Sequence, residues 1–211
     1  MNEGVVLTED QRDCLQEIVN VAIGQSCDSL ARHLKVFVHL SVPRIRVVSK
    51  QSLSVELASF VGCVGAKVSG VSQSFFQVNV APDISGQTFI IFNDFSLREL
   101  AGLLEYEGEL TDAVEKKLLM DIANLLIETC VSRIGQQINT GLSYSDPTVL
   151  GQHILIDDLF DQKKLGWEDA LLVEISYTLE NSPFNCSMFL LMPCESIVVL
   201  KGKLDVLLEG L

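Results

Sequence analysis

Two pairs of polar side chains share one spacing and could do chemistry. In the first pair Glu17 precedes Asn20 by three residues, and in the second Asp121 precedes Asn124 by three residues, at an offset of 104 along the chain. Residues three apart on a helix are neighbours on one face, so each acid and amide would lie side by side. An amide can donate and accept hydrogen bonds at once, which lets it orient a water molecule, while a carboxylate can pair with a cation.

Each pair is followed by a proline at the same distance. Twenty-two residues separate Asn20 from Pro43, and twenty-two separate Asn124 from Pro147. A constant spacer indicates that the same supersecondary unit surrounds both pairs. The pairs lack a nucleophile, a metal cage and a phosphate-binding glycine loop. They are therefore suited to completing a hydrolytic site on a partner, where phosphoryl transfer depends mainly on positioning and charge stabilisation.

The helices expected around the two pairs also repeat. A capping box from Thr8 to Gln11 begins a helix that is expected to run to about residue 34. Thr111 is expected to cap a second helix that runs to about residue 138. The apolar positions of the two helices match at the offset of 104: Leu15 with Leu119, Ile18 with Ile122, Ile23 with Ile127, Leu30 with Ile134, and Leu34 with Ile138.

The segments after each helix predict strands. In the first half these are residues 42–48, 53–64, 67–80 and 87–93, followed by a short helix to about residue 105. In the second half they are residues 153–156, 170–179 and 186–192, followed by a terminal helix. The sequence therefore predicts an internally duplicated α+β fold, a pseudo-two-fold single domain with long helices packed on an antiparallel sheet. The two repeats are expected at about 8–105 and 111–211, within one domain over 1–211.

Composition and charge narrow the class of protein. The chain has 211 residues, 48% of them apolar, which is enough for a core without a disulfide or a metal. It has 15 basic and 28 acidic residues, and the net charge of −13 argues against nucleic acid or an anionic membrane as partner. No apolar run approaches the ~18–20 residues that span a bilayer, and the first residues do not resemble a secretory signal, so a cytoplasmic location is expected. The cysteines form no C-x-x-C pair and the histidines have no zinc spacing, so no metal site is expected.

The first copy resembles the signature of the CheC/CheX/FliY phosphatases of bacterial chemotaxis. That signature, acid-x-x-x-Glu-x-x-Asn-x(22)-Pro, is matched by Asp13, Glu17, Asn20 and Pro43. Two copies in a chain of this length are most similar to the CheC members. The resemblance implies a CheC-like fold and hydrolysis of the aspartyl phosphate of a CheY-type response regulator in two-component signalling.

The resemblance also implies roles for the site residues. The asparagine would enter the regulator's site and align the attacking water, and the acid would pair with the regulator's lysine. Glu17 and Asn20 would take these roles in the first site, and Asp121 and Asn124 in the second. The chain would have no cofactor of its own, because the regulator supplies the magnesium. A phosphorylated CheY-type receiver domain is the implied partner, and a CheD-like deamidase is a further one.

The second copy departs from the signature at two positions. Lys117 stands where the first copy has Asp13, and Asp121 replaces the glutamate. Aspartate is one methylene shorter, and charge-assisted contacts weaken steeply with poor geometry. The sequence therefore predicts a competent first site and a weaker or vestigial second site.

Two other interpretations remain open. The same fold can act as a non-catalytic binding module for the phosphorylated regulator, a CheD-like deamidase or a flagellar-switch component. Alternatively the pairs are structural, and a buried asparagine ties each helix to the loop that follows it. The structural interpretation predicts a clear loss of stability when Asn20 is replaced, which an exposed catalytic asparagine would not show.

Overall fold

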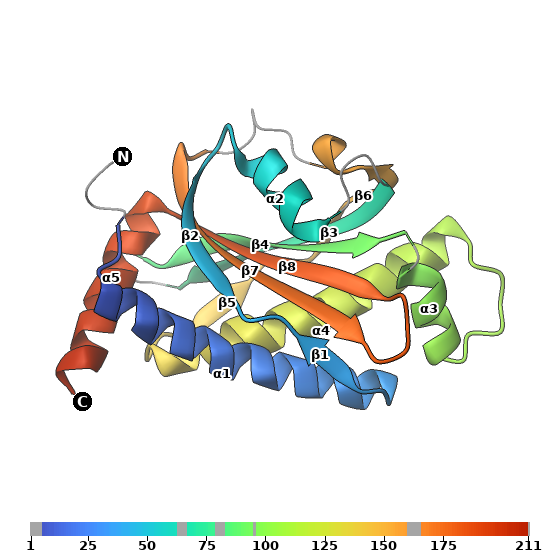
Figure 1. Cartoon of the computed structure of the whole chain (residues 1–211), viewed down its shortest axis with the longest axis horizontal. Coiled ribbons are helices and arrows are strands. Elements are labelled where there is room, and N and C mark those ends of the chain that lie inside the picture. The colour runs from blue at the N-terminus through green and yellow to red at the C-terminus, as the bar shows by residue number, and fades with distance from the viewer. Residues whose placement is uncertain (1–5, 63–66, 79–82, 95, 160–165, 211) are drawn as a thin grey trace.

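Two long helices, α1 (Glu9–Leu34) and α4 (Asp112–Gln137), lie side by side and cover one face of an antiparallel sheet (Figure 1). The computed structural model describes residues 6–62, 67–78, 83–94, 96–159 and 166–210. Thr8 and Gln11 form the predicted capping box at the start of α1. Thr111 caps α4, where its side-chain oxygen accepts from the backbone N–H of Val114. Both predicted helices are confirmed to within a residue at each end.

The matched apolar positions of the two helices form the centre of the main core. Every residue of the predicted pairs is at most 6% exposed and belongs to the cluster between the helices and the sheet. Burying one such side chain contributes about 1.5–3 kcal/mol relative to leaving it exposed. This burial fixes the rotation of each helix about its axis. The acid–amide pairs therefore lie on the stripe that the core positions leave free.

The sheet has eight strands in the described part of the chain, and all its pairings are antiparallel. The strands are β1 (Val38–Leu40), β2 (Arg44–Ser49), β3 (Lys67–Gln77), β4 (Ser85–Asn93), β5 (Leu142–Tyr144), β6 (Thr148–Leu155), β7 (Asp169–Leu179) and β8 (Asn185–Pro193). Their order is β1-β7-β8-β4-β3-β5, with β2 also paired to β7 and β6 also paired to β3. The two strands after α1 thus pair with a strand of the second half, and the two after α4 pair with a strand of the first half. This exchange joins both halves in one sheet.

The order of elements in the first half recurs in the second. In each half a long helix is followed by two strands, a helical segment, two long strands and a closing helix. The helical segments are α2 (Leu53–Val61) and η2 (Ile156–Asp158), and the closing helices are α3 (Ser96–Leu103) and α5 (Cys194–Glu209). The predicted α+β class, with long helices packed on an antiparallel sheet, is confirmed. The duplication, the repeat boundaries and the single domain over 1–211 stay predictions, which this order supports.

The predicted strand over residues 53–64 is wrong in its described part, because residues 53–61 form the helix α2. The buried side chains of α2 are Leu53, Leu57, Ala58 and Val61, which recur at helical spacing. They pack in a second apolar cluster, on the face of the sheet opposite α1 and α4 (Figure 1). A composition rich in valine and serine favoured a strand, but the burial follows the spacing. Residues 63 and 64 lie outside the described residues.

The apolar character of the helices and the state of the cysteines relate to what the composition predicts. Among the described residues, no helix combines the length and the apolar character needed to cross a membrane. The described cysteines, Cys14, Cys27, Cys130, Cys186 and Cys194, are free thiols. Burial raises the pKa of the Cys130 thiol to about 12. Such a thiol is a packing group rather than a nucleophile.

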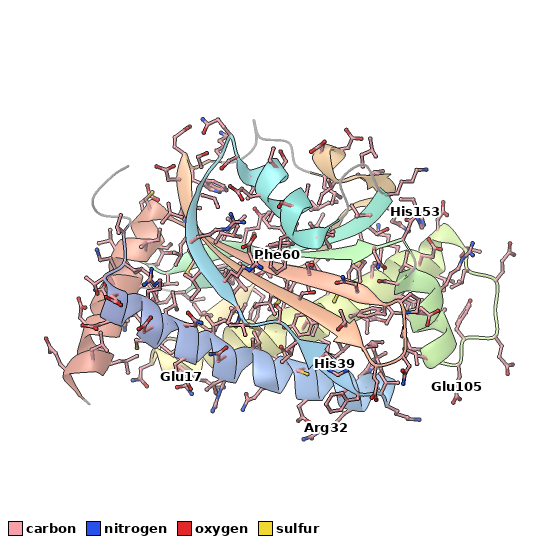
Figure 2. All side chains as sticks on the ribbon, in the orientation of Figure 1. Glu17, Arg32, His39, Phe60, Glu105 and His153 are labelled. Atoms are coloured by element: carbon pink, nitrogen blue, oxygen red, sulfur yellow. The ribbon has the colours of Figure 1, made fainter. Side chains whose placement is uncertain are left out.

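A histidine joins three elements of the fold, at the position labelled in Figure 2. His153 of β6 has a left-handed backbone conformation, with φ of 55°. Its Nδ1 lies 2.7 Å from Asp94 Oδ1, just after β4, and its Nε2 lies 2.7 Å from Glu115 Oε2, in the first turn of α4. These hydrogen bonds, to Glu115 and to Asp94, raise the pKa of His153 above its ordinary value of 6.5.

Replacing His153 with asparagine, which tolerates this backbone conformation, is expected to remove a pH-dependent part of the stability. A histidine whose pKa is raised by folding stabilises the native state fully below its unfolded pKa, and this contribution is lost as pH rises through the raised pKa. The free energy of unfolding of the wild type should therefore exceed that of H153N most below about pH 6, and the difference should shrink as the pH rises through the raised pKa of His153. Urea denaturation at several pH values measures the difference, and a pH-independent difference would contradict the pairing.

Candidate functional site

The first acid–amide pair lies on the outward side of α1. Glu17 and Asn20 are both exposed, and Figure 2 shows Glu17 on the side of α1 that faces away from the sheet. Ile18 and Val19, between them, are buried in the core. Neither the Glu17 nor the Asn20 side chain forms a hydrogen bond or ion pair within the described part of the chain. Both are therefore free to contact a partner protein.

The surface around the first pair is open. Gly24, one turn after Asn20, is exposed, and apart from its chain neighbours and the helix's own backbone no described atom lies within 4 Å of where a side chain would begin. A partner can therefore approach the helix closely at this point. A groove of about 470 Å³ lies beside the first pair. It is lined by Asp10, Asp13, Cys14, Glu17, Ile18, Val21, Gln137, Leu207 and Leu208. Asn20 and Pro43 do not line this groove, and Pro43 is buried directly before β2.

In the second site the structure brings the acid, the amide and the proline together. Asp121, Asn124 and Pro147 line one cavity of about 420 Å³. The other lining residues are Gln73, Met120, Glu128, Tyr144, Ser145 and Asp146. Asp121 is exposed and Asn124 is half-buried. Both sites thus adjoin an acidic groove, but only in the second site do the amide and the proline line it.

Asn124 also differs from Asn20 in having a partner within the chain. The side-chain nitrogen of Gln73, on β3, donates to Asn124 Oδ1 at 3.2 Å and to the backbone carbonyl of Ser145 at 2.9 Å. Ser145 lies in the loop between β5 and β6, two residues before Pro147. The amide of the second site is therefore linked through Gln73 to the loop that carries the proline.

The loop before each proline is held by the same two hydrogen bonds. In the second half the N–H of Ser145 donates to the carbonyl of Ser74 at 3.0 Å, and the N–H of Ser74 donates to Ser145 Oγ at 3.0 Å. In the first half the N–H of Ser41 donates to the carbonyl of Ser176 at 3.0 Å, and the N–H of Ser176 donates to Ser41 Oγ at 2.9 Å. Each loop serine stands two residues before its proline. These bonds give the constant helix-to-proline spacer a physical basis.

The predicted site residues are assembled unequally. Asp121, Asn124 and Pro147 share one cavity, but Glu17 and Asn20 share only an exposed helix face. The structural interpretation requires each asparagine to bond directly to the loop after its helix. Neither asparagine forms such a bond in the described structure. Asn20 has no side-chain hydrogen bond there, and Asn124 reaches its loop only through Gln73.

Two contributors to the second site were missed by the sequence reasoning. Gln73 comes from a strand 51 residues before Asn124, and no spacing in the sequence connects the two. Ser145 can be recognised from the sequence repeat, because Ser41 stands at the matching offset of 104 and before the matching proline. The duplication could therefore have identified the loop serines, but not the glutamine.

Comparisons with known proteins agree with this architecture. No family model matches the chain. The CheY-P phosphatase CheC of Bacillus subtilis (strain 168) is 24% identical over 181 residues, which are 81% of this chain and 81% of that protein. The fold is similar to that of FliY from Thermotoga maritima, with a TM-score of 0.69 and 17% identity over 95% of this chain and 98% of that one. The resemblance to the CheC/CheX/FliY family is confirmed.

The fold of this chain is also similar to that of a protein solved together with a binding partner. FliM in the FliM–SpeE complex from H. pylori has a TM-score of 0.59 and 12% identity over 95% of this chain and 98% of that one. At these identities the two solved structures establish the fold. The likeness to a chemotaxis phosphatase rests on the CheC relative and on the paired motif.

Proposed function

We propose that the chain is a phosphatase that hydrolyses the aspartyl phosphate of a CheY-type response regulator. One observation carries the proposal: each of two matched helices presents an acid and an amide three residues apart, and in each half paired serine bonds hold the loop before the matching proline. The similarity to CheC of B. subtilis, which is a CheY-P phosphatase, supports the same reaction. Such a protein shares the cytoplasm with its regulator.

The asparagine acts on the attacking water. Water adds to phosphorus, the bond between phosphorus and the aspartyl oxygen breaks, and the products are the free carboxylate and inorganic phosphate, which takes up the proton of the water. The amide oxygen accepts a hydrogen bond from the water, and the amide nitrogen can donate at the same time. Holding the water in line with the breaking bond removes much of the entropic part of the barrier.

The acid docks the regulator. Glu17 in the first site and Asp121 in the second pair with the regulator's lysine, and the regulator's own magnesium neutralises charge on the phosphoryl group. With a net charge of −13, this chain gains nothing from overall attraction to an acidic receiver surface. Docking therefore depends on local complementarity at the exposed acid, which sets register and partner choice.

Replacing one asparagine at a time is expected to lower the rate without abolishing it. N20A and N124A should each keep part of the wild-type acceleration, because the other site still works. Loss of labelled phosphate from the phosphorylated receiver measures the rate. Gln25→Ala is the matched control, since Gln25 is another exposed amide on α1 that lies outside the motif. An N20A rate equal to that of the wild type would remove the first site from the proposal.

A binding module without turnover is the second candidate function. The FliM–SpeE complex favours it, because that FliM chain has a similar fold and was solved with a protein partner. A module of this kind would bind the phosphorylated regulator, a CheD-like deamidase or a flagellar-switch component and would leave the rate of phosphate release unchanged. Binding measured beside phosphate release separates the candidates: a binder keeps its affinity in N20A and has no turnover to lose.

A further inference from the structure

Gln73 lies between the sheet and the second site. It is on β3, is 3% exposed, and is one of the residues that line the cavity with Asp121 and Asn124. Its Nε2 donates to two acceptors, Asn124 Oδ1 and the carbonyl of Ser145. Its Oε1 is buried and has no hydrogen-bond partner in the described structure.

The hydrogen bonds fix which way both amides point. A backbone carbonyl can only accept, so the atom of Gln73 that faces the Ser145 carbonyl must be the nitrogen. That nitrogen also faces Asn124, so the atom that Asn124 turns toward it must be the oxygen. The Asn124 nitrogen and the second lone pair of its oxygen are thereby left for groups outside the chain. No such constraint acts on Asn20, which has no side-chain hydrogen bond among the described residues.

The fold itself does not require a glutamine at this position. Gln73 directly precedes Ser74, which bonds the loop serine Ser145, and in the other half Ile175 directly precedes Ser176, which bonds Ser41. Ile175 is therefore the counterpart of Gln73, and it is fully buried. A buried acceptor without a partner costs stability, and an apolar side chain would avoid that cost. The glutamine is present although the matching place in the same sheet is filled by an apolar residue.

We propose that Gln73 is a positioning residue for the second site, which holds the oxygen of Asn124 and so presets the amide for the attacking water. This inference rests on the proposed phosphatase function and adds to it. An amide held in one rotamer loses less entropy when the water and the phosphoryl group bind. The second site is then preorganised and active, although its acid is the shorter aspartate. It differs from the first site because Gln73 supports its asparagine, whereas Asn20 has no such support in the described structure.

The test uses Gln73→Met in the N20A background, where the second site alone accounts for the turnover. The expected result is a fall in kcat of about tenfold with KM unchanged, because docking through Asp121 is untouched. The thermal midpoint should stay the same or rise, because an unpartnered buried oxygen is removed. Gln73→Ile, which copies the first half, is the second variant in case methionine packs poorly. Either variant in the N124A background should leave the rate of the first site unchanged.

Gln77→Met is the matched control. Gln77 lies four residues further along β3, its Oε1 is also buried without a partner, and it does not line the cavity. A kcat of Q73M equal to that of Q77M would overturn the inference, and so would an N20A protein without activity. A fall in thermal midpoint that accounts for the lost rate would make Gln73 a helix-to-loop clamp instead, which also overturns it. A wild type that does not accelerate phosphate release would overturn the phosphatase function itself.

Discussion

Replacing Arg46 with alanine is expected to lower the free energy of unfolding by about 3 kcal/mol. Arg46 of β2 is the partner of Glu174 of β7, whose side chain is completely buried. The Nε and one terminal nitrogen of the guanidinium donate to the two carboxylate oxygens at 3.0 and 2.6 Å, and the other terminal nitrogen contacts Glu56 of α2. Without the arginine, a buried charge lies unpaired beneath α2. The lower end of the usual range applies because 35% of the Arg46 side chain is exposed.

Arg32→Ala is the matched control for that prediction. Arg32 pairs with Asp28 one turn earlier on α1, and these side chains are 80% and 57% exposed, so its loss should cost less than about 1 kcal/mol. Replacing both Arg46 and Glu174 with apolar residues, as methionine and leucine, should restore most of the stability, because no unpaired charge then remains. Urea denaturation measures all three variants. Equal losses for R46A and R32A would show that the buried carboxylate does not depend on its arginine.

Replacing Asn20 and Asn124 together with alanine is expected to lower the acceleration of phosphate release by at least about 10²-fold. Both sites then lose the group that holds the water, while Glu17 and Asp121 remain available for docking. Phosphate release at a fixed receiver concentration measures the loss. A double variant that keeps the wild-type rate would show that the amides do not position the water.

The same variant should stay folded and keep binding. Asn20 is exposed and has no side-chain bond in the described structure, so its loss should change the unfolding free energy by less than about 0.5 kcal/mol. Asn124 loses one hydrogen bond, from Gln73, at a cost of about 1 kcal/mol. Circular dichroism and equilibrium binding of the phosphorylated receiver test both points. A large drop in stability would favour a structural role for the pairs over a catalytic one.

The long helices could be predicted from the sequence because their signals are local. In α1 the capping box and the apolar spacing lie within a single continuous segment, and the spacing of Leu15, Ile18 and Ile23 gives the buried face directly. The matching positions in α4 follow from the offset of 104. These faces in turn leave the acid–amide pairs on the outer stripe, so the exposure of Glu17 and Asn20 follows from the helix pattern.

The sequence fails to predict the helix α2 and the short strands β1 and β5, for different reasons. In α2 the composition favours a strand, and only the spacing of the buried residues indicates a helix. Strands β1 and β5 have three residues each, too few to show a period, and they exist because β7 and β3 pair with them. Short strands of this kind are defined by a partner far away in the sequence.

Some residues of the candidate site can be found from the sequence, and others only from the folded structure. The acid, the amide and the proline could be found because a repeat with a fixed spacer is visible in the sequence. Gln73 could not be found, because it reaches Asn124 only when α4 has packed on β3. The difference between a supported amide in the second site and an unsupported one in the first is therefore a property of the folded sheet. It favours activity in the copy that the sequence alone treated as the weaker one.

Phosphate release from an excess of phosphorylated CheY-type receiver is the most direct test of catalysis by this chain. With wild-type protein well below the receiver concentration, each molecule is expected to release many equivalents of phosphate, faster than the receiver alone. The N20A/N124A protein, at the same concentration, is expected to leave the decay close to that of the receiver alone. Release that stops at one equivalent per chain, or a decay that the wild type slows or leaves unchanged, would contradict a phosphatase and indicate a binding protein.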